Sequence, residues 1–462
     1  MTTFIGRENE LRALNRAYES PGSAFIPLYG RRRVGKSELI VQLLKDRPGI
    51  YFLGKQAPAA MQIHEFLTEA ATILQEPLLA GLATESWSEA LEAVVSRWRS
   101  DRKLIVALDE FQWIVAASPE LPSVLQEKWD RSWRQAGNIV LILCGSYIGF
   151  MEREVLGKKS PLFGRRTAQI LLRPFGYREA AEFHPRYSRI DQARTYFLCG
   201  GVPLYLRRFS DSRSIEANLA AELLDEYAPL YREADFLLRE ELREVTLYYA
   251  ILTALAAGHT TVQAIARQTG QDPRALSYYL QQLQELGYVE RRYPLSTGEP
   301  PSPRSVHYDL TDPLLRFWFR FIFPSTSYIR HMGSDRALKD LIRPHLEPYF
   351  GLCFERLCRE ALPWLYLKEG VAAAFEVGQY WSRTTQIDVV GLRDDGRTDL
   401  GECKWGPVRS PKAVEQELET KLKEFPNPRG ATLGRRIFTR QKSKTADSSS
   451  GARWHGLDDL YT

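Results

Sequence analysis

The feature that most constrains this chain is an eight-residue stretch at positions 30–37, GRRRVGKS. The apolar residues 24–29 before it predict a buried strand, and the amphipathic residues 38–44 after it predict a helix. In a strand-to-helix turn of this kind, the loop amides and the helix N-terminus face an anion. Lys36 would neutralise its phosphates and the Ser37 hydroxyl would be a ligand for Mg²⁺. We therefore expect ATP and Mg²⁺ to bind here, through Gly30, Arg31, Arg32, Arg33, Val34, Gly35, Lys36 and Ser37.

An acidic pair directly follows a second apolar run, residues 104–108. Burying two charges without a partner is costly, so Asp109 and Glu110 predict a strand end that faces the phosphate loop. Asp109 is expected to hold Mg²⁺ through water, and Glu110 to orient and deprotonate the attacking water. The pattern therefore predicts that ATP is hydrolysed as well as bound.

Two later segments offer further contacts to ATP. Residues 139–144 predict a buried strand that ends at Gly145 and Ser146; Ser146 could sense the γ-phosphate or the lytic water, or form a simple strand-end turn. Arg165 and Arg166, in SPLFGRRT, could stabilise charge on the ATP of a neighbouring subunit in a homo-oligomer. A solvated arginine pair is the alternative.

Apolar runs alternate with amphipathic runs from residue 4 to about residue 173, which is typical of a parallel α/β layer fold. Residues 25–29, 50–53, 104–108, 139–144 and 168–172 are the expected strands. The five cysteines show no CxxC spacing, which argues against a zinc site or a disulfide framework. The start of the chain has no apolar signal segment, and the most apolar run, residues 313–324, is too short for a membrane span. We expect a cytoplasmic protein without membrane contact, and a buried role for residues 313–324.

Several motifs occur in an order that resembles the archaeal-type ATPase family, within the AAA-like and STAND P-loop NTPases. They are FIGR at 4–7, the phosphate loop, LDEFQW at 108–113, SPLFGRRT at 160–167 and GGVPLYL at 200–206. The resemblance covers roughly residues 3–310. It implies that residues 201–203 lie near the nucleotide as a lid motif, and that a winged helix packs on the ATPase.

Residues 240–310 have the helix and strand pattern of a winged helix. Its third helix is expected to begin with Asp272 as N-cap and Pro273 in the first turn, and the wing strands at 288–293 and 305–310. The buried stripe of that helix would be Ala275, Leu276, Tyr279, Leu280, Leu283 and Leu286, leaving Arg274, Ser277, Tyr278 and Gln281 exposed. The segment holds six Arg and no Lys against eight Asp or Glu, which disfavours it as a lone DNA binder. A structural or switching role is favoured over DNA reading.

A β-hairpin is expected at residues 386–405, around the turn Asp394-Asp395-Gly396. Pairing that is symmetric about Asp395 puts Asp388 opposite Glu402 and Gln386 opposite Lys404, with all four side chains on one face. Two facing carboxylates repel unless a cation lies between them, so the set predicts a Mg²⁺ site formed by Asp388 and Glu402. The metal would activate a water and Lys404 would stabilise the developing negative charge.

This spacing resembles the PD-(D/E)XK nuclease core, a domain that the archaeal-type ATPase family often carries at its C-terminus. Glu355, in the preceding helix, stands where such nucleases often have a further acid. Gln386 departs from the pattern, because related domains often have Glu at that position. A retained fold with an inactive or merely DNA-binding site is therefore the alternative. Residues 400–445 hold eleven Lys or Arg against five Asp or Glu, which favours a nucleic-acid partner.

We therefore predict an α/β protein: a P-loop ATPase core (1–173), a helical lid (174–235), a winged helix (236–312), a helical connector (313–347) and a nuclease-like domain (348–462). The predicted function is ATP hydrolysis coupled to a Mg²⁺-dependent nuclease-like domain that acts on DNA. One alternative is an ATP-dependent signalling switch that uses an inactive nuclease fold to dock a partner or DNA. Another is a transcription regulator that reads DNA through the winged helix.

Overall fold

The computed structural model describes residues 4–242, 244–296, 305–442 and 451–462. The chain forms two compact units, one of residues 1–174 with 202–204 and one of residues 175–201 with 205–462. Most of the segment between the two predicted wing strands lies outside the described residues. Within the described residues, no helix combines the length and the apolarity that crossing a membrane requires.

The first unit is built on a parallel five-stranded sheet in the order β2-β3-β4-β1-β5. This confirms the predicted α/β layer fold and its five strands. The strands are β1 (Ala24–Tyr29), β2 (Gly49–Leu53), β3 (Leu104–Asp109), β4 (Ile139–Gly145) and β5 (Ile170–Leu171). The helices are α1 (Glu8–Glu19), α2 (Lys36–Leu44), α3 (Ala59–Leu74), α4 (Trp87–Val95), α5 (Phe111–Ala117), α6 (Leu121–Lys128), α7 (Arg134–Ala136) and α8 (Ile148–Phe150).

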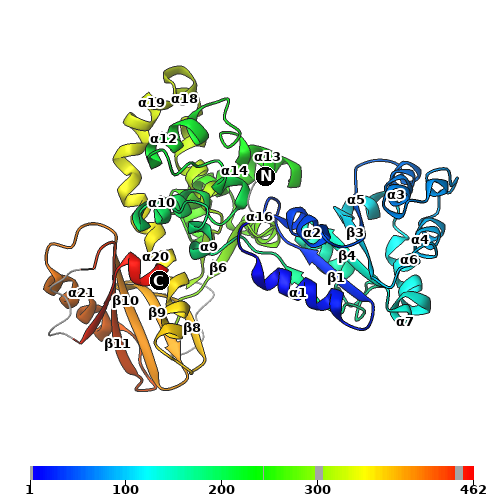
Figure 1. Cartoon of the computed structure of the whole chain (residues 1–462). Coiled ribbons are helices and arrows are strands. Elements are labelled where there is room, and N and C mark those ends of the chain that lie inside the picture. The colour runs from blue at the N-terminus through cyan, green and yellow to red at the C-terminus, as the bar shows by residue number, and fades with distance from the viewer. Residues whose placement is uncertain (1–3, 243, 297–304, 443–450) are drawn as a thin grey trace. The chain divides into compact units, whose positions relative to one another are not determined.

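Both faces of this sheet are buried, as its continuous apolar strands require. Phe25 and Tyr29 of β1 join a core with α3, α4, α5 and α6, whereas Ile26 and Leu28 join a second core with α1 and α2. Helices therefore lie on both sides of the strands, as Figure 1 shows. The carboxyl ends of β1, β3 and β4 meet at one edge, where the predicted site residues follow them.

The second unit begins with short helices, α9 (Tyr177–Ala181), α10 (Arg189–Cys199), α12 (Ile215–Asn218) and α13 (Glu233–Glu241), while α11 (Pro203–Leu206) joins the two units. The helices α14 (Val245–Ala256), α15 (Val262–Thr269) and α16 (Pro273–Glu285) and the antiparallel pair β6 (Val289–Arg292) and β7 (His307–Leu310) follow. This is the predicted winged-helix pattern, with Asp272 capping α16. The four leucines predicted to form the buried stripe of α16 are buried. The prediction was wrong for Ala275, which is exposed.

A helical segment follows, with α17 (Pro313–Phe317), α18 (Thr326–Met332), α19 (Ser334–Ala337) and the long α20 (Arg343–Lys368). The aromatic run at 313–324 is core, as predicted: Phe317, Trp318, Phe319 and Phe321 are buried. Helix α20 contains Glu355, which was predicted to lie in a helix.

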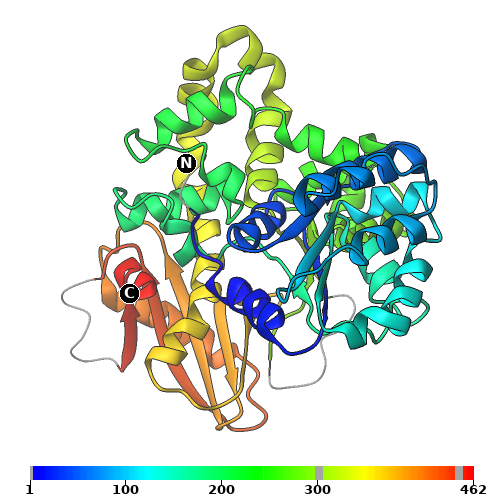
Figure 2. The same ribbon diagram turned by 45° about the vertical axis from the view of Figure 1, so that its right-hand side comes forward.

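The C-terminal part is a mixed five-stranded sheet in the order β12-β11-β10-β9-β8. Its elements are β8 (Phe375–Trp381), β9 (Gln386–Arg393), β10 (Arg397–Lys404), α21 (Pro411–Glu424), β11 (Thr432–Thr439), β12 (Ala452–His455) and α22 (Leu457–Tyr461). A side chain at Gly391 would meet Leu362 and Tyr366 of α20, whereas its neighbour Val390 packs with Val414 and Leu418 of α21. The two helices therefore cover opposite faces of the sheet, and Figure 2 shows α20 in front of the strands.

Candidate functional site

The phosphate loop has the backbone conformation that its glycines were expected to provide. Gly30 has φ +156°, and a Cβ there would lie 2.2 Å from the Leu172 carbonyl oxygen, so no larger residue fits. Gly35 has φ +95° and caps the N-terminus of α2. The loop thus passes from β1 into α2 with the helix N-terminus directed at its concave side.

Lys36 lies buried inside this loop. Its Nζ donates to the carbonyl oxygens of Gly30 (3.0 Å) and Arg31 (2.9 Å). Burial lowers the pKa of Lys36, although Glu110 and Asp109 act in the opposite direction. The ammonium group is therefore held by weak carbonyl acceptors, which phosphate oxygens could replace.

Ser37 and Asp109 come from different elements and meet at the end of β3. The Ser37 hydroxyl donates to Asp109 Oδ2 at 2.6 Å, and the Tyr51 hydroxyl donates to the same oxygen at 2.6 Å. Asp109 is fully buried, and its other oxygen accepts from the Glu110 amide. Burial and the neighbouring Asp109 raise the pKa of Tyr51 well above its ordinary value.

The sequence analysis missed Tyr51. It lies on β2, which pairs with β3 so that Leu53 is beside Asp109. Tyr51 could have been found from its position on β2, which lies beside the strand that ends at Asp109. The sequence does not show that these two strands are neighbours.

Glu110 contacts the predicted sensor residue. The Ser146 hydroxyl donates to Glu110 Oε2 at 2.7 Å, and Gln112 Nε2 donates to the Ser146 hydroxyl at 3.1 Å and to the Glu110 carboxylate. Glu110 has φ +48°, an uncommon conformation for a residue with a side chain. The turn that follows β3 therefore holds this carboxylate against the end of β4.

Outside the loop, the predicted lid and arginine residues have different surroundings. Pro203 of the GGVP motif lies next to the loop, 3.8 Å from where a Cβ on Gly35 would be. Arg165 forms a two-pronged ion pair with Asp130, with a shortest distance of 2.6 Å, while Arg166 is exposed. The pairing of Arg165 favours the predicted alternative of a surface arginine, and Arg166 keeps an exposed position.

The C-terminal hairpin has the predicted register over most of its length. Thr398 pairs with Leu392 and Gly401 with Val389, symmetrically about Asp395. The paired residues end there, one step short of Asp388 and Glu402. Asp388 Oδ2 instead accepts from the Cys403 backbone amide at 3.0 Å.

The reason is an irregularity in β9. Gly378 of β8 pairs with Val390, and Tyr380 of β8 pairs with Ile387. The two residues are two positions apart on β8, whereas their partners are three positions apart on β9. One extra residue at Asp388–Val389 therefore breaks the strict alternation on which the single shared face was predicted. Ile387 and Val390 consequently both point into the core beneath α21.

Glu402 is surrounded by lysines. Lys404 Nζ lies 2.8 Å from Glu402 Oε1, and Lys421 Nζ of α21 lies 2.6 Å from Glu402 Oε2. Glu417, one turn before Lys421, contacts both lysines. Lys421 and Glu417 belong to the basic segment 400–445, but they were not predicted as part of this cluster.

Three carboxyl groups lie close enough to affect one another's ionisation. Burial, followed by the charge of Asp388, raises the pKa of Glu355 to about 7. Burial raises the pKa of Asp388, and burial with the charge of Asp388 raises the pKa of Glu402. Arg359 of α20 donates to the Asp388 carbonyl at 2.6 Å and so fixes the irregular turn of β9. Among the described residues, no group of three or more His, Cys, Asp or Glu has an arrangement that could hold a metal ion.

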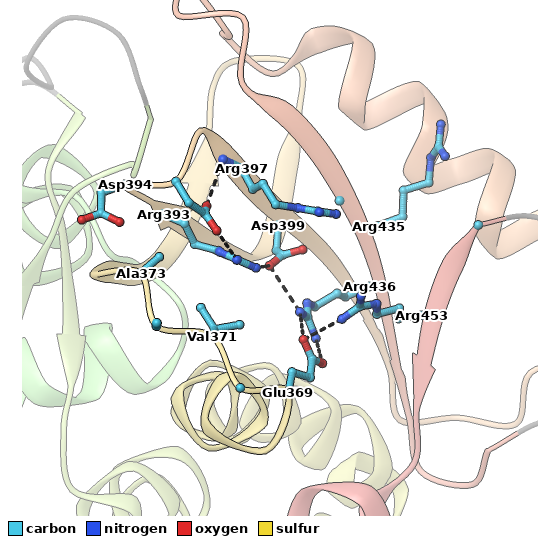
Figure 3. Close-up of a pocket in the computed structure, with 15 residues that line it drawn as sticks. Glu369, Val371, Ala373, Arg393, Asp394, Arg397, Asp399, Arg435, Arg436 and Arg453 are labelled. Atoms are coloured by element: carbon cyan, nitrogen blue, oxygen red, sulfur yellow. Dashed lines mark hydrogen bonds and ion pairs between the residues drawn. The ribbon is translucent and has the colours of Figure 1, made fainter.

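A second charged region lies at the opposite end of the same strands, around the hairpin turn. Figure 3 shows it as a pocket of about 600 Å³ into which arginines from β9, β10, β11 and β12 project. Arg436 is almost fully buried and forms two short contacts with Glu369 (2.6 and 2.7 Å), which also binds Arg453. Asp399 accepts from Tyr366 and lies near Arg393 and Arg436.

The wing contacts the C-terminal sheet and α20. The Leu295 amide donates to the Gln379 carbonyl at 2.8 Å, and the rings of His307 and Trp381 stack at 4.4 Å. Asp309 of β7 pairs with Arg292 at 2.6 Å and with Arg356 of α20. The wing is therefore bound to the domain that holds Asp388, while Arg274, Ser277, Tyr278 and Gln281 on α16 are exposed.

Comparison with known proteins identifies the first region. Residues 4–209 match the family described as an ATPase domain predominantly from Archaea. This part of the chain is therefore similar to archaeal-type P-loop ATPase domains. Residues 249–292 match the IclR helix-turn-helix domain, and residues 318–416 match a family of archaeal and bacterial proteins of unknown function. None of these matches identifies the C-terminal part as a nuclease.

Similar full-length proteins were also found. An uncharacterized protein of Methanocaldococcus jannaschii is 29% identical over 426 residues, which cover 91% of this chain and 92% of that protein. A Walker-type ATPase of Pyrococcus abyssi aligns with a TM-score of 0.49 and 21% identity, covering 68% of this chain and 96% of its own. The Aeropyrum pernix ORC2 protein aligns with a TM-score of 0.44 and 16% identity, covering 73% and 96%.

Proposed function

We propose that this protein hydrolyses ATP with Mg²⁺ in its archaeal-type ATPase domain, and that hydrolysis controls a Mg²⁺-dependent nuclease-like site acting on DNA. The contact of Ser37 with Asp109, beside a buried Lys36, carries the first part. It brings together, from α2 and β3, the hydroxyl and the carboxylate that the sequence predicted as Mg²⁺ ligands.

The residues at the phosphate loop fit a bound Mg²⁺–ATP. Ser37 and Asp109 offer hard oxygen ligands at one point, and Lys36 donates to carbonyl groups that phosphate oxygens can replace. Mg²⁺ would neutralise charge on the phosphate oxygens when bound. Lys36 would do the same from the other side, while the amides at the start of α2 orient the chain of phosphates.

Glu110 is the proposed base of this reaction. It would accept a proton from the attacking water, since Ser146 and Gln112 already hold its carboxylate in one orientation. Ser146 would also report the presence of the γ-phosphate, because its hydroxyl can donate to only one acceptor at a time.

The proposed second site consists of Asp388, Glu402 and Lys404, with Glu355 nearby. Its donor atoms are carboxylate oxygens. Burial raises the pKa of all three groups, the charge of Asp388 adds to the shifts of Glu355 and Glu402, and a divalent cation would favour their ionised forms. These residues therefore suit Mg²⁺ in charge and ligand type. On binding, the metal would replace Lys404 and Lys421 as the partner of Glu402. Bound Mg²⁺ would supply an activated water, and Lys404 would stabilise negative charge on the phosphate being attacked.

The order of elements from α20 through three antiparallel strands, α21 and β11 supports the restriction-endonuclease-like fold expected from the sequence. The basic segment 400–445 supports DNA as the substrate. The contact of the wing with α20 and β8 supports a route by which the ATPase cycle reaches Asp388.

The decisive experiment compares ATP hydrolysis and cleavage of DNA and RNA, with Mg²⁺ or Mn²⁺, in three proteins: wild type, Lys36→Ala and Asp388→Ala. We expect Lys36→Ala to abolish hydrolysis and alter cleavage, and Asp388→Ala to abolish cleavage while hydrolysis continues. A wild-type protein that cuts no nucleic acid, with Asp388→Ala behaving identically, would refute the second half of the proposal.

The pairing of Glu402 with two lysines, together with Gln386 in place of an acid, favours a second candidate function. In that case the protein is an ATP-dependent switch whose nuclease fold docks a partner or DNA without cutting it. ATP-dependent assembly or DNA binding, with no cleavage under any metal, would support this candidate over the first.

A further inference from the structure

A pocket of about 660 Å³ lies beside the proposed second site. Its walls come from the start of α20, the end of β10, the loop that follows and the first turn of α21. Most of the lining is apolar, with Pro348, Trp405, Pro407, Val408 and Val414 among its residues. Neither the sequence analysis nor the comparisons assign a role to it.

Lys404 connects this pocket to the carboxylates. It lines the pocket, and its Nζ lies 2.8 Å from Glu402. The next residue, Trp405, is held in place by its indole N–H, which donates to Glu347 at 2.9 Å. A group in the pocket therefore lies next to any phosphate that Lys404 contacts.

The chemistry of the walls selects the kind of group. A planar, largely apolar ring fits between prolines, valines and a tryptophan, and the volume is in the range of small-molecule sites. Three charged residues line the pocket. The acidic one, Glu347, is paired with Arg194 and Arg440, and the two cations, Lys404 and Arg409, would favour a ring that is attached to a phosphate. A nucleobase within a DNA strand has both properties.

We propose that this pocket receives one unstacked base of the nucleic-acid strand whose phosphate lies at Asp388, Glu402 and Lys404. The inference rests on the proposed function, since it assumes that the second site acts on nucleic acid. It also specifies the substrate class. A paired and stacked base cannot enter a pocket in the protein, so the base comes from a single strand, or it is flipped out of a duplex at a cost in unpairing energy.

The test measures binding separately from cleavage. The full-length protein, in metal-free buffer, is titrated with fluorescent single-stranded oligonucleotides in which one abasic residue is moved along the sequence. An abasic residue at one position removes the contacts of one base with the pocket walls and is expected to weaken binding by about 10-fold, while other positions have little effect. A fully paired duplex of the same sequence is expected to bind more weakly than the single strand.

Two variants identify the pocket as the source of the effect. Val408→Trp fills the pocket and is expected to remove the difference between the intact and the abasic strand. Leu367→Trp adds the same bulk at an exposed position of α20 outside the pocket and is expected to leave the difference unchanged.

The outcomes separate this inference from the proposed function. Equal binding of all abasic strands, or a position effect that survives in Val408→Trp, overturns the pocket assignment even if the protein cleaves DNA. A position effect that Val408→Trp removes supports the pocket even if no metal induces cleavage. Binding of apolar peptides without any binding of nucleic acid overturns both.

Discussion

Both ends of the C-terminal sheet carry carboxylates whose pKa values are shifted, but the shift is downward at one end and upward at the other. Around the hairpin turn, arginines meet the carboxylates: burial opposes ionisation of Glu369, but Arg436 outweighs it and lowers the pKa of Glu369 (Figure 3). At the other end, Glu355, Asp388 and Glu402 crowd together, and their pKa values are raised. At the first end the arginines outweigh burial, whereas at the second end burial outweighs the two lysines that pair with Glu402.

This difference separates a structural role from a functional one. Matched buried charges fix strands relative to one another, and a protein gains nothing chemical from them. Buried carboxylates with raised pKa values gather at functional sites, where a cation or a substrate interacts with them. The comparison therefore points to the Asp388 end for chemistry, although the Arg436 end has the larger number of charged groups.

The largest expected effect tests the functional end. Asp388→Asn should reduce metal-dependent cleavage by about 100-fold or more, because it removes one of the proposed metal ligands. Its free energy of unfolding should hold or rise, since one of three crowded charges is lost. Asp394→Asn, an exposed change on the hairpin turn, is the control for cleavage. Equal cleavage by the two variants would contradict a catalytic role for the Asp388 end of the sheet.

The next effect tests the structural end. Glu369→Gln should lower the free energy of unfolding by about 3 kcal/mol, because Arg436 is left buried without its main charge partner. Urea denaturation measures this loss, and cleavage of DNA at a temperature well below unfolding should be unchanged. A stable variant with reduced cleavage would show that the arginine pocket has a direct part in function.

A third prediction concerns pH. A carboxyl whose folded pKa is raised contributes stability below its unfolded pKa, and that stability is lost as pH rises through the folded pKa. For Glu355 the window lies between its ordinary value near 4.5 and about 7. Across it, the wild type should lose about 3 kcal/mol that Glu355→Gln does not lose.

Thermal unfolding at several pH values, with and without Mg²⁺, measures this window. Asp388 and Glu402 shift in the same direction, so the variant should keep a smaller slope of its own. Glu376→Gln, at an exposed position of β8, should show the full wild-type slope. Stability of the wild type that rises with pH between 5 and 7 would contradict the predicted crowding.

The smallest expected effect concerns Arg453, at the end of the sheet near the hairpin turn. Arg453 shares Glu369 with Arg436 but is more than half exposed. Water screens an exposed ion pair, so Arg453→Ala should change the free energy of unfolding by less than about 1 kcal/mol. If its loss equals that of Glu369→Gln, the pocket's stability depends on all its arginines and not on the buried one.

Much of the first site could be predicted from local sequence, because its residues follow strand ends in a fold with a fixed strand direction. Lys36, Ser37, Asp109, Glu110 and Ser146 all lie at the carboxyl edge of one parallel sheet. Tyr51 and Gln112 were missed, since their parts depend on which strands are neighbours and on the turn after β3.

The C-terminal site was predictable to a smaller extent. The turn at Asp394–Gly396 set the hairpin register, and the structure has that register from Leu392 to Val389. It could not reveal the extra residue at Asp388, because that irregularity arises from the pairing of β9 with β8 on its other side. Nor could it reveal Lys421, which reaches Glu402 only because α21 folds back across the sheet.

The sequence by itself thus determined the phosphate loop, its acidic pair and the hairpin turn, because each depends on residues within a few positions of one another. The tertiary structure alone decided which charges meet. Burial and the neighbours that strand order brings together set the ionisation of Glu355, Asp388 and Glu369, and residue type carries no information on either. The pocket beside Lys404 has the same origin, since its walls are α20, β10 and α21, which only the folded chain places side by side.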